Sequence, residues 1–269
     1  SYILIKKALV VFSPFQLGAL RLTISALAFL PFLLYRFRDV RWEKWPFLLL
    51  VGLTGTGLPS VLFPMAQQGI SSSLAGILNS LTPLFTLVLG IFLFRTRFVW
   101  SKLLGVLLGL VGAAILVVRS AGGDVAGSAG FALLAILGSL CYAVSSNTVA
   151  TFLRDQSSLL ISAASFIMVG GPAAAYLFGA TDFVQVLDSQ PGAWVGLGYV
   201  ALLALFSTVL ASVIFFQLIQ WTSALFSSMV SYLVPLVAVA WGAFDNEPLN
   251  TAIFLGMGLI LSGVYLSRQ

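Results

Sequence analysis

The sequence is poor in charge and in the residues on which most catalytic and metal sites depend. Only 8% of its 269 residues are charged, whereas a typical soluble domain carries about 25%. Histidine is absent, which removes the commonest metal ligand and the usual base of a serine hydrolase. The one cysteine, Cys141, cannot form an intramolecular disulfide. So few polar side chains cannot cover a water-facing surface, and a soluble globular protein is therefore excluded.

Apolar residues make up 60% of the chain and form long continuous runs. A helix that spans a bilayer needs about 20 mostly apolar residues, and the alternation typical of barrel strands is not seen. We therefore predict an all-α integral membrane protein with ten transmembrane helices, the first of them incomplete at its N-terminus. The expected spans are 1–12, 14–35, 45–67, 73–94, 99–118, 130–153, 159–179, 193–219, 223–243 and 252–266.

The two halves of the sequence are related by an internal repeat. At an offset of 152 residues, 60–94 aligns with 212–246 without a gap. Each half holds five expected spans, and because five is odd, the second half must enter the membrane in the opposite sense. The sequence thus predicts two inverted five-helix repeats, 1–119 and 129–268, around a central cavity. The identities that carry the repeat include Pro83 with Pro235 and Gly90 with Gly242.

The charges of the connecting loops support an inverted arrangement. The loop 36–44 is rich in Arg and Lys, whereas its counterpart 181–191 carries only acids. The same contrast separates 95–102, which is basic, from 245–247, which is acidic. Arg and Lys prefer the cytoplasmic side, so we predict a multi-pass protein of the cell membrane with both termini in the cytoplasm. The net charge of +5 needs no nucleic-acid partner.

Polar residues inside the expected spans are candidates for the cavity lining, because hydrocarbon cannot satisfy their hydrogen-bonding groups. Arg21 lies about 10 Å into its helix, where a charge usually faces a cavity or a partner. It either anchors a substrate carboxylate, or it snorkels or bonds to backbone carbonyls. Gln67 and Ser145 belong to the same polar class, and for any one residue a bond between helices is the alternative. The expected substrate-binding residues are Tyr2, Arg21, Ser60, Asn79, Tyr142, Asn147, Gln217 and Tyr232.

Prolines and glycines mark expected helix breaks and helix contacts. A proline inside a span frees a backbone carbonyl and kinks the helix, and matched breaks in two halves point to a central site. We expect such a gating role at Pro59, Pro83 and Pro235, although proline is also simply common in membrane helices. Small residues let helices approach closely, so Gly105-x-x-x-Gly109 and Ala252-x-x-x-Gly256 are interpreted as packing faces between the halves.

The stretch from Gly55-Thr-Gly-Leu-Pro-Ser to Asn79-Ser-Leu-Thr-Pro83 resembles the drug/metabolite transporter superfamily, EamA type. Leu20-Arg21 and the later stretch Tyr232-Leu-Val-Pro235 resemble it too. The resemblance covers nearly the whole chain, as two copies. It implies ten helices, a central cavity and the movement of metabolites such as amino acids, often outward.

Together these features predict a secondary transporter, an exporter or exchanger of small metabolites such as amino acids that works by alternating access. Its partners would be a small-molecule substrate and the lipid bilayer. A passive channel or facilitator is the main alternative, because no carboxylate lies in mid-span to relay protons. A membrane-embedded enzyme would need a cluster of catalytic side chains, and none is visible. We therefore expect no enzymatic activity, no cofactor and no metal, and the chain lacks a nucleotide-binding loop.

Overall fold

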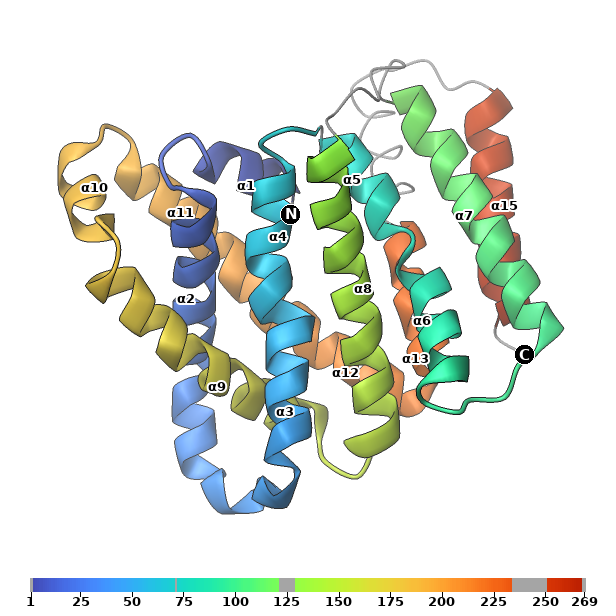
Figure 1. The fold of residues 1–269 in the computed structure, drawn as a ribbon, viewed down its shortest axis with the longest axis horizontal. Coiled ribbons are helices and arrows are strands. Elements are labelled where there is room, and N and C mark those ends of the chain that lie inside the picture. The colour runs from blue at the N-terminus through green and yellow to red at the C-terminus, as the bar shows by residue number, and fades with distance from the viewer. Residues whose placement is uncertain (1, 71, 121–128, 234–250, 268–269) are drawn as a thin grey trace.

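The computed structural model describes residues 2–70, 72–120, 129–233 and 251–267. All regular secondary structure within these ranges is helical. Figure 1 shows most of the helices running between two opposite edges of the molecule, with short connections at each edge. The first half, in chain order, consists of α1 (Tyr2–Ala8), α2 (Pro14–Tyr35), α3 (Trp45–Gly52), α4 (Leu58–Ala66), α5 (Ser72–Asn79), α6 (Thr82–Phe92) and α7 (Trp100–Ser120).

The second half is helical too, although α8 is much longer than α1. Its described elements are α8 (Ala129–Phe152), α9 (Ser158–Gly179), α10 (Phe183–Ser189), α11 (Ala193–Ala204), α12 (Ala211–Trp221), α13 (Ala224–Ser228), the 3-10 turn η5 (Met229–Tyr232) and α15 (Thr251–Ser267). Within the described ranges, five helices are long and apolar enough to cross a membrane. They are Pro14–Tyr35, Trp42–Ala66, Ala129–Phe152, Ser158–Gly179 and Ala193–Trp221. The exact number of ten spans and the inversion of the halves stay predictions.

Two of the long helices contain a π-helical turn at corresponding places. In the first half, η3 (Leu53–Gly57) joins α3 to α4, and in the second half η4 (Leu205–Leu210) joins α11 to α12. The first residues of the two turns are 152 residues apart, the same offset that aligns the two halves of the sequence. π-turns are rare and frequently mark functional sites. Their recurrence supports the predicted repeat.

The fourth expected span, 73–94, is two helices in the structure. α5 ends at Asn79 and α6 begins at Thr82, so Pro83 lies in the first turn of α6. Proline has no N–H to donate to the carbonyl four residues earlier, which here is that of Asn79. The Thr82 hydroxyl donates to this Asn79 carbonyl instead, at 2.7 Å. The break is thus stabilised locally, and the proline starts a helix rather than kinking one.

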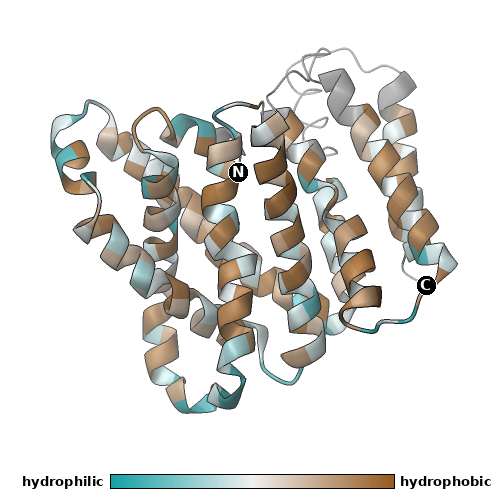
Figure 2. Ribbon diagram, viewed as in Figure 1, coloured by the Kyte–Doolittle hydropathy of each residue, from teal (hydrophilic) through white to brown (hydrophobic). Residues whose placement is uncertain are grey.

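The lateral surface of the bundle is apolar. Figure 2 shows hydrophobic residues along the helices and hydrophilic residues gathered mainly in the turns at their ends. Large side chains such as Leu34, Phe206 and Tyr265 are more than 60% exposed. Exposed apolar area of this extent is unfavourable in water and marks a surface that faces lipid or a partner.

α7 and α15 pack closely along their glycines, as the small-residue pattern of the sequence predicts. A Cβ atom on Gly105 would lie 2.5 Å from the Gly263 carbonyl oxygen, and one on Gly112 would lie 2.6 Å from that of Gly256. No side chain fits at such distances. The two helices also enclose, with Leu87 of α6, a buried apolar cluster.

We predict that Gly263→Leu disrupts this contact, because its Cβ would meet the Gly109 backbone nitrogen at 2.7 Å. Overpacking of this kind costs about 1–3 kcal/mol. Gly258→Leu is the matched control, since nothing lies within 4 Å of a Cβ at that position of the same helix. Thermal unfolding in detergent should show a clearly lower midpoint for Gly263→Leu alone. Equal midpoints for both variants would contradict the contact.

Candidate functional site

A cavity of about 500 Å³ lies between the two halves of the chain. Its walls come from α1, α2, η3, α4 and the α5–α6 break of the first half, and from α8, η4, α12, α13 and η5 of the second. Both π-turns and the break before Pro83 therefore border the same space. These three interruptions of regular α-helix thus lie around the central cavity.

The lining contains pairs of residues related by the 152-residue offset. Thr56 of η3 pairs with Thr208 of η4, and Phe63 pairs with Phe215. Further pairs with different side chains are Gly55 with Ser207 and Asn79 with Ser231. Equivalent positions of the two halves thus face one cavity, as expected if two copies of one unit enclose it.

Arg21 is the only charged residue among the described residues that line the cavity. Its side chain is buried, and its Nε donates a hydrogen bond of 2.7 Å to the Thr208 hydroxyl. The guanidinium also interacts with the Tyr142 hydroxyl. Arg21 belongs to the first half of the chain, whereas both of these partners belong to the second. The charge therefore bridges the halves and does not snorkel outward.

The rest of the lining combines aromatic rings with hydroxyl groups. The Phe63 and Tyr142 rings stack with their centroids 5.8 Å apart. The hydroxyls of Ser145 and Ser231 are buried and find no hydrogen-bond partner among the described residues. Buried polar groups usually have a partner, so these two hydroxyls are suited to a bound solute or water. The cavity can hold a molecule with an anionic group, an apolar body and further polar atoms.

Three of the residues expected to bind substrate, Arg21, Asn79 and Tyr142, line this cavity. Four others lie elsewhere, where each bonds to a neighbouring backbone or helix. Ser60 of α4 donates to the Gly57 carbonyl in the preceding π-turn η3, and Gln217 accepts from Ser158 of α9. Asn147 donates to the Thr86 carbonyl of α6, and Tyr232 donates to that of Val106 in α7.

The structure describes two of the three prolines for which a gating role is expected. Pro59 and Pro83 are buried, and each lies in the first turn of a helix that follows a π-turn or a break. Neither is among the residues that line the cavity. Pro235 and the side chain of Tyr2 lie outside the described residues.

Sequence reasoning missed the threonine pair Thr56 and Thr208. Both residues are buried and both line the cavity. A signal for them exists, because the two are identical at the 152-residue offset, four positions before the aligned stretch begins at Ser60. Threonine is common in membrane helices, where its hydroxyl can bond to its own helix backbone, so it does not stand out as Arg21 does.

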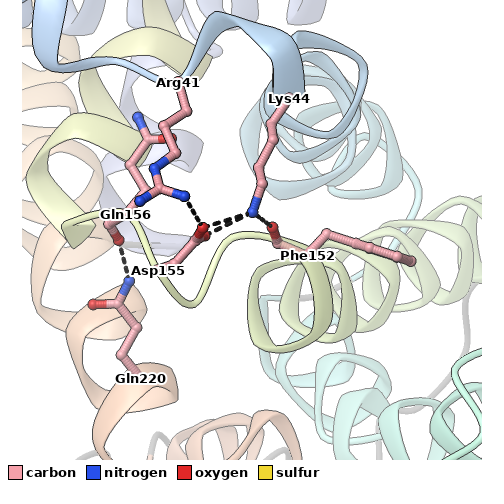
Figure 3. Close-up of polar contacts among 6 residues, drawn as sticks. All are labelled: Arg41, Lys44, Phe152, Asp155, Gln156 and Gln220. Carbon is pink, nitrogen blue, oxygen red and sulfur yellow. Dashed lines mark hydrogen bonds and ion pairs between the residues drawn. The ribbon is translucent and has the colours of Figure 1, made fainter.

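A polar cluster joins the two halves at one edge of the bundle (Figure 3). The Asp155 carboxylate, in the α8–α9 connection, accepts hydrogen bonds from Lys44 at 2.7 and 2.9 Å and from Arg41 at 2.5 Å. Lys44 also donates to the Phe152 carbonyl at the end of α8. The hydrogen bond from Lys44, with the nearby positive charges, holds the pKa of Asp155 below its ordinary value. The carboxylate therefore stays ionised at neutral pH.

The cluster reaches a third element through two glutamines. Gln220, near the end of α12, donates from its side chain to the Gln156 carbonyl at 2.5 Å. Arg41 and Lys44 belong to the first half, whereas Asp155, Gln156 and Gln220 belong to the second. We call these five residues the edge latch, since they connect three elements at the edge that carries the basic loops.

The chain belongs to the EamA-like transporter family, whose model matches residues 1–118 and again residues 130–269. It is thus a membrane protein with transmembrane helices and a member of a transporter family. Because one family model matches twice, the division into two related units gains support, and the boundaries 1–119 and 129–268 stay a prediction.

Relatives of similar length carry transporter names. A protein of Archaeoglobus fulgidus named an uncharacterized transporter is 26% identical, over 94% of this chain and 88% of its own. The inner membrane transporter YedA of Escherichia coli K12, named as uncharacterized, is 26% identical over 99% of this chain and 85% of its own. One crystal structure shares the fold with a TM-score of 0.71 at 19% identity, covering 98% of this chain and 90% of the other.

We predict that Thr208→Val destabilises the protein more than Thr56→Val. The first change removes the hydroxyl that accepts the hydrogen bond from the buried Arg21 Nε, so Nε loses this acceptor. Such a loss costs about 1–3 kcal/mol. Thr56 is the equivalent residue of the other half, and its hydroxyl makes no hydrogen bond among the described residues. Denaturation in detergent measures both variants, and equal losses of stability would contradict the bridging role of Arg21.

Proposed function

We propose that the protein is a secondary transporter that moves small metabolites bearing a carboxylate, such as amino acids, by alternating access. The observation that carries this proposal is the central cavity, whose described lining contains one charge, Arg21, together with aromatic rings and hydroxyls. An Arg guanidinium matches the geometry of a carboxylate. The family membership supports transport, and the chemistry of the lining supports the class of solute.

The position of Arg21 couples solute binding to the contact between the halves. Its Nε bonds to Thr208 of the opposite half. A carboxylate that enters the cavity competes for the same guanidinium, so it changes the free energy of this contact. A ligand shifts an equilibrium only by its differential affinity for the two states. Because solute and Thr208 compete for Arg21, the affinity for solute differs between a state in which the Arg21–Thr208 hydrogen bond is formed and a state in which it is broken.

The edge latch is proposed to close one end of the cavity. Figure 3 shows Arg41 and Lys44 converging on Asp155 across the boundary between the halves. Rocking of one half against the other must break these contacts. The pairs are partly exposed, and exposed ion pairs contribute at most about 1 kcal/mol. Such a latch is strong enough to bias the closed state and weak enough to open.

The orientation proposed for the membrane rests on the basic loops. The edge with the latch also carries Arg36, Arg38 and the stretch 95–102, so it is assigned to the cytoplasm. Figure 1 places this edge opposite the connection from α1 to α2. Figure 1 shows α15 ending near this edge and α1 near the opposite one, so the C-terminal end is proposed to lie on the cytoplasmic side, while the cytoplasmic N-terminus stays a prediction. Solute would then leave or enter the cytoplasm when the latch opens.

We predict that Arg21→Gln reduces transport of a zwitterionic amino acid by about 10-fold to 100-fold. This range corresponds to about 1.5–3 kcal/mol for a hydrogen bond to a charged group. Purified protein in liposomes is assayed with a panel of amino acids, and Arg38→Gln is the control because it removes an exposed base outside the cavity.

Two results of this assay would contradict the proposal. One is transport at the normal rate by folded Arg21→Gln protein, which would exclude the anchoring role. The other result concerns the carrier mechanism. With an exchanging carrier, solute loaded inside the liposomes accelerates the uptake of external solute. An unsaturable flux with no such acceleration would favour the channel alternative.

We predict that Asp155→Asn makes the cavity more accessible from the cytoplasmic side. Ser145→Cys places a thiol in the cavity wall, in a background in which Cys141→Ser removes the native one. A membrane-impermeant thiol reagent should label it several-fold faster in inverted vesicles when the latch is weakened. Asp39→Asn is the control, because Asp39 pairs with Arg36 within a single loop and joins no halves. Equal labelling rates in both variants would exclude the latch as a gate.

A further inference from the structure

A second pocket, of about 220 Å³, lies at the same edge of the bundle as the latch. Its described lining comes from α6, α7, α8, the loop after α6, and the junction of α12 with α13. On α6, Thr86 of this pocket lies one helical turn from Thr82 of the central cavity. The second pocket is thus a separate space between the central cavity and the end of the bundle, and we call it the basic pocket.

The basic pocket is lined by Arg97, Lys102 and Arg154 and by no acid among the described residues. Arg97 and Lys102 form no ion pair within the described ranges, and Arg154 makes one long hydrogen bond of 3.4 Å to the Gln220 carbonyl. The adjacent acid, Asp155, is engaged by the latch. Three like charges around one small pocket repel one another, and an anion bound between them relieves that repulsion.

The chain holds these groups in place through a specific turn. Arg95 adopts a left-handed backbone with φ of 54°, which directs the chain out of α6. The Thr96 N–H then donates to the Gly90 carbonyl at 2.8 Å. A Cβ on Gly90 would lie 2.9 Å from the Thr96 hydroxyl oxygen, so the close approach requires glycine. Thr96 and Arg97 are therefore positioned by the backbone and are not part of a free loop.

The donors available for an anion lie at the rim of the pocket. The hydroxyls of Thr96 and Thr151 line it and make no hydrogen bond among the described residues. The floor offers less, because the Asn147 amide group already donates to two backbone carbonyls and Leu87 and Leu225 are apolar. The rim thus combines three cations with two free hydroxyls, a donor set that fits the several oxygens of a phosphate group.

Exposed aromatic rings place the pocket at the level of lipid headgroups. Phe98 and Trp100 flank the loop, are 46% and 70% exposed, and form an edge-to-face pair with centroids 5.0 Å apart. Tryptophan is enriched where a membrane meets water, so Trp100 supports this level. Basic pockets between transmembrane helices on the cytoplasmic side are suited to anionic headgroups.

We propose that the basic pocket binds a phosphate group, supplied by the headgroup of an anionic phospholipid or by free phosphate. The site is distinct from the central cavity, and binding there does not depend on the proposed transport. Such a ligand would engage Arg97, Lys102 and Arg154, which the proposed transport cycle does not use.

The test compares the protein in nanodiscs of phosphatidylglycerol with the protein in nanodiscs of phosphatidylcholine. Phosphatidylglycerol should raise the unfolding midpoint and should remain bound in native mass spectrometry. Inorganic phosphate is titrated into the phosphatidylcholine sample as the second source. Stabilisation by phosphatidylglycerol alone identifies a lipid site, and stabilisation by phosphate as well identifies a site for free phosphate.

The variant Arg97→Gln/Lys102→Gln should strongly reduce both effects. Each base near an anionic lipid contributes about five-fold to affinity, so the pair should weaken binding roughly 25-fold. Lys6→Gln/Arg38→Gln removes the same charge from exposed positions outside the pocket and should bind as the native protein does. Both variants should unfold at the native midpoint in phosphatidylcholine. Absence of any response to either phosphate source, or equal losses in the two double variants, would overturn the proposal.

Discussion

The architecture depends on one constraint: hydrocarbon offers no hydrogen-bonding partner to a backbone that leaves the regular helix. Each irregular turn must therefore find its partners within the protein. The Thr82 hydroxyl donates to the Asn79 carbonyl, which Pro83 cannot do, and the hydroxyl of Thr208 in the π-turn η4 donates to the Leu203 carbonyl of α11 at 3.2 Å. Irregular backbone persists at membrane depth only where protein or a water-filled cavity surrounds it. The helix breaks and the central cavity therefore occur together, because irregular backbone at membrane depth needs the surroundings that the cavity and its walls provide.

The cavity combines a repeated framework with an unequal distribution of charge. Thr56 and Thr208, at equivalent places in the two π-turns, border the same space. Arg21 has no basic counterpart among the described residues of the lining, and it bonds to Thr208 rather than to Thr56. Two similar units therefore share one cation. In the proposed function, this asymmetry would give a solute with one anionic group a single preferred position, next to the contact between the halves.

The class of fold, the charged centre of the cavity, Asn79 and Tyr142 could be predicted from the sequence, whereas most of the remaining lining could not. Runs of apolar residues define the long helices well, and α2 coincides with the expected span 14–35. Arg21 stands out because charge is costly inside a membrane. A polar residue such as Tyr232 gives no such indication, since it serves equally well as a bond between helices. A π-turn adds a residue and rotates the remainder of the helix by about 100°, so a regular helical pattern does not predict which residues beyond η3 and η4 face the cavity.

The central claim is that one five-helix unit occurs twice, in opposite orientations, around a shared cavity. Its most direct test uses Arg38→Cys and Asp188→Cys, each in a Cys141→Ser background, because these residues occupy the loops after the second span of each unit. An impermeant thiol reagent is applied to sealed vesicles of each orientation. The account predicts labelling of position 38 from the cytoplasmic side and of position 188 from the opposite side. Labelling of both positions from the same side would contradict it.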